Sequence, residues 1–160
     1  MNEDDTRAVK PPCARDAIAT IHGVVSLVFL AAAFVPALIL LFNHSVAIGV
    51  IEIALLGGGA VTAVSVFCTK CPCRESCAHV LPGMISRKMP DRKGPYTVTE
   101  LITVIVMFAL PVLFPHVWLV RDTVYFAAFW FLLTVGIVEI MIFVCPRCGN
   151  NFCPSYRIWH

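Results

Sequence analysis

The sequence predicts an all-α integral membrane protein, a four-helix bundle made of two repeated transmembrane hairpins with a cysteine-rich cytoplasmic cap that binds metal. Three observations predict it. The 160 residues are 59% hydrophobic and only 14% charged, which is more apolar surface than a soluble core of this size could bury. Four apolar runs are each long enough to cross a hydrocarbon core. Two cysteine clusters, residues 68–77 and 145–153, each follow one of these runs.

The first hairpin is expected over residues 17–67, after a polar tail. Its first span, about 17–42, has no charged residue, and at ~1.5 Å per residue it covers roughly 30 Å or more. Its second span, about 46–67, is interrupted only by Glu52. Three consecutive glycines, residues 57–59, would let another helix approach closely, so we expect this helix to be the packing centre of the bundle.

The second hairpin follows a basic, proline-containing loop that we expect to be the longest non-helical segment. Thr97 and Glu100 have the spacing of a capping box, and Asp122 is suited to cap the last span. The predicted division is an N-terminal tail (1–16), the first hairpin (17–67), a cysteine cluster and cytoplasmic loop (68–96), the second hairpin (97–144, spans about 98–120 and 123–144), and a cysteine knuckle with a tail (145–160).

The basic residues predict the orientation. With the N-terminus inside, only Arg121 of the 12 Lys and Arg residues falls outside, which is a strong positive-inside bias. Both termini and both cysteine clusters are therefore expected on the cytoplasmic side of a membrane of the inner, cytoplasmic type. A net charge of +2 gives no argument for a nucleic-acid partner.

The two hairpins carry matching anchors, which predicts an internal repeat. His44 and His116 mark their outer turns, 72 residues apart, and Cys68 and Cys145 begin the Cys-x-x-Cys pairs, 77 residues apart. Two hairpins of like orientation predict a duplicated unit about an axis normal to the membrane.

The paired cysteines predict a metal site. A two-residue spacer lets both sulfurs of a pair face one ion at ~2.3 Å. If the hairpins pack as a repeat, the two pairs meet at the inner ends of the second and fourth helices. The predicted ligands are Cys68, Cys71, Cys145 and Cys148.

The segment from Cys145 to Gly149, Cys-Pro-Arg-Cys-Gly, resembles the metal knuckle of rubredoxins and zinc ribbons, and this resemblance implies backbone N–H groups aimed at sulfur. The run from Cys68 to Cys77 resembles a ferredoxin cluster motif with one residue missing between its second and third cysteines. A second metal or cluster would draw on the remaining donors, with zinc and iron–sulfur both open. These donors are Cys73, Cys77, Cys153, Cys13 and His79.

Two acidic residues lie inside the apolar runs. Placing an ionised Glu52 or Glu139 there would cost ~2.5–3.5 kcal/mol each. Each residue is therefore a functional group, for example in proton transfer with a quinone, or it is a protonated or hydrogen-bonded side chain of the bundle interior. For Glu139 we expect the second role, and for Glu52 both remain open.

We therefore expect a small membrane metalloprotein with a cytoplasmic zinc or iron–sulfur site. It would act in electron transfer or as an accessory subunit. Its expected partners are membrane lipid and either a larger membrane complex or further copies of the same chain. A thiol–disulfide oxidoreductase or redox sensor is the first alternative. Quinone-linked disulfide-forming proteins and vitamin K epoxide reductases are similar four-helix membrane proteins with paired cysteines. A zinc-clasped scaffold without catalytic activity is the second alternative.

Overall fold

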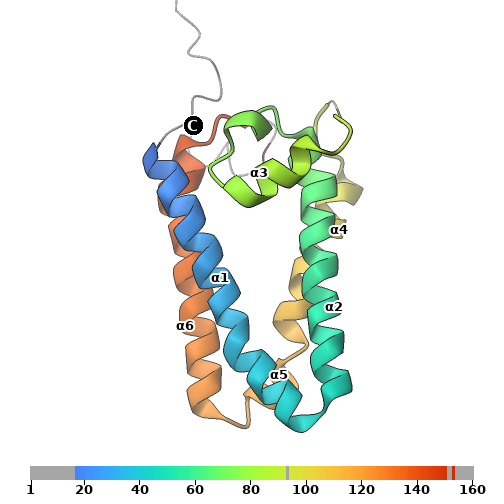
Figure 1. Cartoon of the computed structure of the whole chain (residues 1–160), viewed down its shortest axis with the longest axis vertical. Helices are drawn as coiled ribbons and strands as arrows, with labels where there is room; N and C mark the ends of the chain where they lie inside the picture. Colours follow the sequence, from blue (N-terminus) through green and yellow to red (C-terminus); the bar gives the residue numbers. More distant parts are fainter. Residues whose placement is uncertain (1–16, 93, 151–152, 154–160) are drawn as a thin grey trace, which may run out of the picture.

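The computed structural model describes residues 17–92, 94–150 and 153, and this part of the chain is helical and has no strand. Four helical segments are long and apolar enough to cross a membrane (Figure 1). The prediction of an all-helical chain with four helices able to cross a membrane is thus confirmed. The predicted N-terminal tail, with Cys13, lies outside the described residues, as does the tail after Cys153. The four segments are Ala17–His44, Val46–Lys70, Val98–Leu119 and Thr123–Arg147.

The first hairpin turns within a single residue. Helix α1, Ala17–His44, contains Pro36 and continues past the expected end near residue 42. Only Ser45 separates it from α2, Val46–Thr62. Backbone hydrogen bonds from Ser45 N to Leu41 O (2.8 Å) and from Gly49 N to Ser45 O (3.1 Å) continue the helical pattern through the turn, which explains why no separate loop forms.

The third span begins at the predicted capping box. Glu100 N donates to Thr97 Oγ1 at 3.3 Å, and Thr97 N donates to Glu100 Oε2 at 2.8 Å, which fixes the start of α4, Val98–Leu113. Pro115 lacks the N–H that would continue this helix. A one-turn helix, α5 (His116–Leu119), completes the span.

The fourth span begins at Asp122, as predicted. Its carboxylate accepts from the backbone N–H groups of Val124 and Tyr125 and caps α6, Thr123–Glu139. Satisfying these first N–H groups is what an N-cap side chain does.

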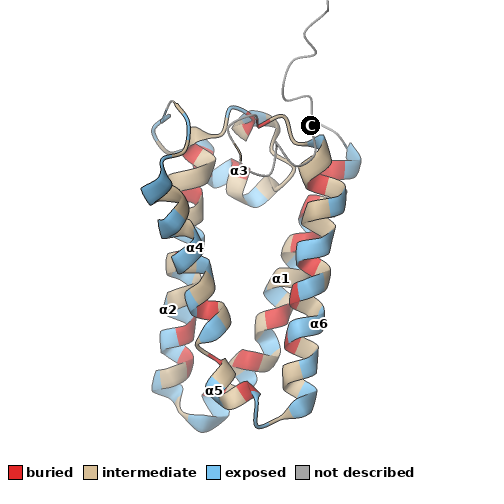
Figure 2. Cartoon of the chain, turned by 180° about the vertical axis from the view of Figure 1, so that it is seen from behind, coloured by how far each residue is buried: buried red, intermediate tan, exposed pale blue. Residues whose placement is uncertain are grey.

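The helices pack as two pairs, α1 along α6 and α2 along α4 (Figures 1 and 2). We call the end with the residue-45 turn and α5 the turn end, and the end crossed by residues 71–97 the loop end. The main buried cluster lies between α1, α5 and α6, and its fully or almost fully buried members are Ala33, Ala37, Leu119, Phe129 and Leu133.

The expectation that α2 is the packing centre is therefore wrong. Gly58 and Gly59 do meet α4 at Met107, but a Cβ at Gly57 would find nothing within 4 Å. An equally close approach occurs between α1 and α6: a Cβ at Gly136 would lie 2.9 Å from the Leu30 side chain, as a Cβ at Gly59 would from Met107 O on α4. The main buried cluster therefore lies around α1 and α6, and α2 meets α4 closely only at Gly58 and Gly59.

The ends of α2 and α6 have the same sequence of elements. After α2 come a π-helical turn, Ala63–Phe67, and a 3₁₀ turn, Cys68–Lys70. After α6 come a π-helical turn, Ile140–Val144, and a 3₁₀ turn, Cys145–Arg147. Corresponding elements are equal in length and start 77 positions apart, since Val46 and Thr123 begin the two helices.

The loop end contains a helix that the sequence did not predict. Residues 78–96 were expected to be non-helical, but Val80–Arg87 forms α3. The expectation was wrong because Pro82 lies in the first helical turn, where its missing N–H costs no hydrogen bond, and because Gly83 N donates to His79 O at 3.0 Å. Helix α3 lies across the loop end of the bundle (Figure 1).

Candidate functional site

The two Cys-x-x-Cys pairs have the same local conformation. Cys71 N donates to Cys68 O at 3.2 Å, and Cys148 N donates to Cys145 O at 3.1 Å. The backbone dihedrals of the last cysteine also agree, with φ −72° and ψ 120° at Cys71 and φ −80° and ψ 125° at Cys148. Each 3₁₀ turn therefore presents its second cysteine at the loop end in the same way.

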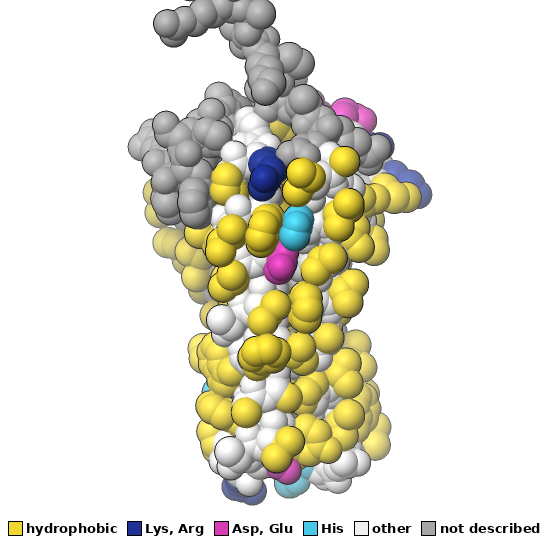
Figure 3. Space-filling model, turned by 90° about the vertical axis from the view of Figure 1, so that its left-hand side faces the viewer, with side chains coloured by type: hydrophobic (Ala, Val, Ile, Leu, Met, Phe, Trp, Pro, Cys, Tyr) yellow, Lys and Arg dark blue, Asp and Glu magenta, His cyan; other side chains and the backbone are white. Residues whose placement is uncertain are grey.

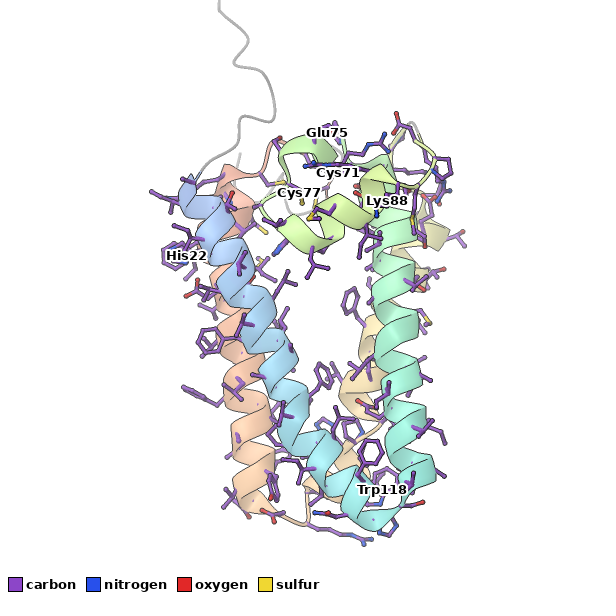
Figure 4. The ribbon with its side chains drawn as sticks, viewed as in Figure 1. His22, Cys71, Glu75, Cys77, Lys88 and Trp118 are labelled. Atoms are coloured by element: carbon purple, nitrogen blue, oxygen red, sulfur yellow. The ribbon has the colours of Figure 1, made fainter. Side chains whose placement is uncertain are left out.

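A small cavity lies between the two cysteine clusters. Its volume is about 70 Å³, and its lining includes three free thiols, those of Cys71, Cys77 and Cys148, together with His79. Figure 4 shows Cys71 and Cys77 on the segment that crosses the loop end. Residues from after α2 and from after α6 thus meet around one space.

Each of these three sulfurs receives a backbone hydrogen bond from the residue two positions later. The donors are the N–H groups of Cys73 for Cys71, of His79 for Cys77, and of Asn150 for Cys148. Hydrogen bonds to sulfur favour the thiolate, which is the form that binds metal. The resemblance of the Cys145–Gly149 segment to a metal knuckle implied such bonds, and the structure extends the pattern to Cys71 and Cys77.

Burial opposes ionisation of the same thiols. It raises the pKa of Cys71 to about 12, and it is also the main cause of the raised pKa values of Cys77 and Cys148. Cys148 further raises the pKa values of both Cys71 and Cys77, because a second negative charge nearby is unfavourable. The cluster therefore needs a cation if its sulfurs are to be thiolates at neutral pH.

His79 is held in the tautomer that suits a metal ligand. Its Nδ1 lies 3.0 Å from Gly23 O on α1. Because a carbonyl oxygen can only accept, Nδ1 carries the proton and Nε2 carries the lone pair. Burial lowers the pKa of His79, which keeps the ring neutral. Metal-binding histidines commonly donate their other N–H to a backbone carbonyl in this way.

Gly23 makes this contact with α1 feasible. A Cβ at Gly23 would lie 2.5 Å from Ala78 O, so only glycine lets the backbone before α3 approach α1. Sequence reasoning missed Gly23 because a single glycine in an apolar helix carries no distinctive pattern.

The predicted four-sulfur set is only partly assembled around the cavity. Cys71 and Cys148 line it, whereas its described lining does not include Cys68 or Cys145. Within the described residues, no three His, Cys, Asp or Glu side chains are already close enough to hold a metal ion. Closing the cavity around an ion would require movement of these side chains, which stand on short turns rather than inside long helices.

Two of the remaining candidate donors, Cys73 and Cys153, lie near the cavity. Cys73 is buried and lines the cavity, but its sulfur is in a disulfide and so has no thiolate to offer a metal in this state. Cys153 is free and interacts electrostatically with Cys145 and Cys148. Cys13 lies outside the described residues.

Lys70, although it stands between two cysteines, turns away from the sulfurs. Its Nζ donates to Glu100 Oε2 at 2.7 Å and to Pro95 O at 3.2 Å. Glu100 also accepts from Arg92 Nη2 at 2.7 Å. The positive charge of Lys70 is therefore used to hold the loop against the start of α4 and does not offset negative charge on the thiols.

Tyr96 connects the two cysteine clusters. Its hydroxyl donates to Phe67 O at 3.1 Å and accepts from Asn150 Nδ2 at 3.0 Å, and its ring stacks on Phe67 with centroids 4.3 Å apart. The contact depends on the loop folding back over the end of α2, so spacing along the sequence does not reveal it.

The two intramembrane acids have different surroundings. Glu139 Oε2 lies 2.6 Å from Nδ1 of His22, in keeping with its expected role as a hydrogen-bonded side chain. Glu52 is fully buried, and neither of its oxygens has a hydrogen-bond partner among the described residues.

Comparison with known proteins gives no further guidance, since the chain matches no family model, no curated protein and no solved structure.

Proposed function

We propose that the protein is a multi-pass membrane metalloprotein that binds zinc at its loop end through Cys71, Cys77, Cys148 and His79. The observation that supports this most directly is that three free thiols and one imidazole, drawn from both cysteine clusters, line one small cavity. Three cysteines and one histidine form one of the common ligand sets of structural zinc, which binds four ligands tetrahedrally.

Zinc is favoured over an iron–sulfur cluster by the histidine. Most iron–sulfur clusters are held by cysteine thiolates alone, whereas His79 contributes a neutral imidazole already oriented by Gly23 O at 3.0 Å. The iron–sulfur alternative would use Cys68, Cys145 or Cys153 in place of His79. It would give the protein a role in electron transfer, with a membrane quinone as one candidate partner.

A zinc ion at this position would act as a clasp. Cys71 and Cys77 follow α2, Cys148 follows α6, and His79 is bonded to α1. One ion would therefore tie together the α1–α6 and α2–α4 pairs at the end opposite the turns. The equal elements that end in the two Cys-x-x-Cys turns support the duplicated hairpin that would bring the ligands together.

We assign this clasp to an accessory or scaffolding subunit of a membrane complex, with the loop end in the cytoplasm. Arg87, Lys88 and Arg92 lie in the loop-end segment, and the positive-inside bias supports that side. The apolar faces support contact with lipid or with partner helices. Figure 3 shows that hydrophobic side chains cover most of one long face of the molecule.

The test is metal analysis of the full-length protein, purified without oxygen and without added metal. We expect a colourless sample with about one zinc per chain. Cys148→Ser should lose the zinc, and Ser76→Ala, which alters the cavity lining without removing a ligand, should keep it. Zinc lost from Cys68→Ser and Cys145→Ser but kept in Cys77→Ser would assign the site to the two Cys-x-x-Cys pairs. A brown sample that contains iron and sulfide would show that the site holds an iron–sulfur cluster and not zinc.

Thiol–disulfide exchange is the second candidate, since free thiols share a cavity. The raised pKa values of Cys71, Cys77 and Cys148 count against it, because the thiolate is the attacking species. Metal-free protein whose thiols react rapidly with an alkylating agent at neutral pH would support exchange over metal binding.

A further inference from the structure

Glu52 is a carboxyl group buried inside the half of the bundle nearest the turns. It lies on α2 within the span Val46–Lys70, and its exposed fraction is 0%. Both of its oxygens are buried and have no hydrogen-bond partner within the described residues. A buried polar group of this kind is costly, and an ionisable residue in a membrane span is by default a candidate functional site.

The packing of α2 on α4 shows what lies at the depth of Glu52. A Cβ at Gly59 would lie 2.9 Å from Met107 O, so these two residues are opposite each other. The two helices run in opposite directions and lie side by side (Figures 1 and 2). Every residue advances an α-helix by the same distance along its axis. Counting seven residues toward the turn end leads from Gly59 to Glu52 on α2 and from Met107 to Phe114 on the third span. Glu52 and Phe114 therefore lie at about the same depth.

At this depth the third span is interrupted. Helix α4 ends at Leu113 and α5 begins at His116. Pro115 lacks an N–H, so the carbonyl group of Pro111, four residues earlier and close to the level of Phe114, loses its usual helical donor. Such carbonyl groups at a break in a membrane helix carry partial negative charge, and in membrane transporters they serve as ligands for small cations.

We propose that Glu52 and the open carbonyl end of α4 form an intramembrane site for an alkali-metal cation, which exchanges with the proton of the Glu52 carboxyl group. An ionised carboxylate in this apolar interior requires a compensating positive charge. Carboxylate and carbonyl oxygens are the ligands that hard cations prefer. The site is independent of the loop-end zinc site, because it shares no residue with it and lies toward the opposite end of α2.

The experiment uses dicyclohexylcarbodiimide, an apolar reagent that modifies protonated carboxyl groups. The full-length protein in detergent micelles is treated at constant pH and ionic strength in choline chloride, or with lithium, sodium or potassium chloride in its place. Modified residues are located by peptide mass spectrometry. Glu52 should be labelled in choline, and at least one alkali cation should slow its labelling about tenfold or more. Labelling of Glu139, which is paired with His22, should not respond.

A thermal unfolding measurement accompanies the labelling. The cation that protects Glu52 should raise the Tm of the unmodified protein, and Glu52→Gln, which keeps the size of the side chain, should abolish that increase while leaving the zinc content unchanged. The proposal is overturned if no alkali cation slows the labelling of Glu52 or raises the Tm. Labelling that responds to pH but to no alkali cation is one such result. It is also overturned if Glu52→Gln retains the full cation-dependent increase in Tm.

Discussion

His22 Nδ1 lies 2.6 Å from Glu139 Oε2, a contact that joins α1 to α6 across 117 positions of sequence. The His22 ring also stacks on Phe143, with the centroids 4.0 Å apart. The two side chains are 28% and 21% exposed. His22 points away from the bundle interior in Figure 4, and a histidine and an acidic side chain lie side by side on the largely hydrophobic face in Figure 3. Each side chain thus provides the hydrogen-bond partner that water cannot provide at this position.

Removing one partner of this pair should destabilise the protein. Glu139→Leu leaves the imidazole of His22 without its hydrogen bond, and we expect the free energy of unfolding to fall by about 1–3 kcal/mol. The measurement is unfolding in detergent. Changing both residues, His22→Phe with Glu139→Leu, should recover most of the loss, because no polar group is then left unpaired. A single variant as stable as the parent would show that the contact contributes nothing.

Gly23 should be far more sensitive to a methyl group than Gly57. Gly23→Ala places a Cβ 2.5 Å from Ala78 O, whereas a Cβ at Gly57 meets nothing within 4 Å. We expect Gly23→Ala to lower stability by roughly 1–3 kcal/mol through overpacking and to weaken zinc binding, because His79 loses its support. Gly57→Ala should be neutral or stabilising by up to about 1 kcal/mol. Thermal unfolding and zinc content of both variants check this, and equal behaviour would contradict it.

The network around Glu100 should hold the loop to α4. Glu100 accepts from Lys70 and Arg92 and completes the capping box with Thr97. Glu100→Gln keeps the shape but removes the charge, and we expect the free energy of unfolding to fall, because the capping box and the hydrogen bonds from Lys70 and Arg92 are weakened. Glu75→Gln is the matched control, since the Glu75 side chain is 72% exposed and exposed ion pairs contribute little. A larger loss for Glu75→Gln would contradict this assignment.

Zinc binding should release protons. Because the pKa of Cys71 is raised to about 12 and those of Cys77 and Cys148 are also raised, all three thiols carry protons near pH 7.5 when no metal is bound. Zinc displaces these protons, so about three should be released per ion, and affinity should fall as the pH falls. Calorimetry in buffers of different ionisation enthalpy measures the number, and release of fewer than one proton would contradict thiolate ligation.

The same shifts give the metal-free protein a pH-dependent stability. A folded-state pKa above the unfolded value of ~8.5 means that the folded protein holds these protons more tightly. Its contribution to stability is complete below pH ~8.5 and is lost as the pH rises toward 12. Metal-free protein should therefore unfold more easily at pH 10 than at pH 8, as followed by chemical denaturation, and zinc should reduce this difference. A stability that increases over this range would show that the thiols are not buried as described.

Much of the fold was predictable because it depends on local signals. The apolar runs, the capping box at Thr97 and the cap at Asp122 each act within a few residues, and the structure confirms them. The predicted helix ends were less accurate. Helix α3 was missed because proline and glycine in its sequence obscured the backbone hydrogen bonds that form it.

The arrangement of the site could not be read from spacing alone. The sequence identified every cysteine of the cavity but grouped Cys68 with Cys71 and Cys145 with Cys148, since spacing describes neighbours along the chain. The structure instead places Cys77 and His79 beside Cys71 and Cys148. That grouping depends on the close approach at Gly23 and on the tyrosine at position 96, both of which are contacts between distant segments.

The central claim is that the loop end binds zinc through three sulfurs and one imidazole. X-ray absorption at the zinc edge of the anaerobically purified protein tests it most directly. We expect a four-coordinate shell with three sulfur ligands at ~2.3 Å and one nitrogen ligand at ~2.0–2.1 Å, and the loss of that nitrogen in His79→Ala. A shell of oxygen and nitrogen ligands without sulfur, or protein that carries no zinc, would contradict it.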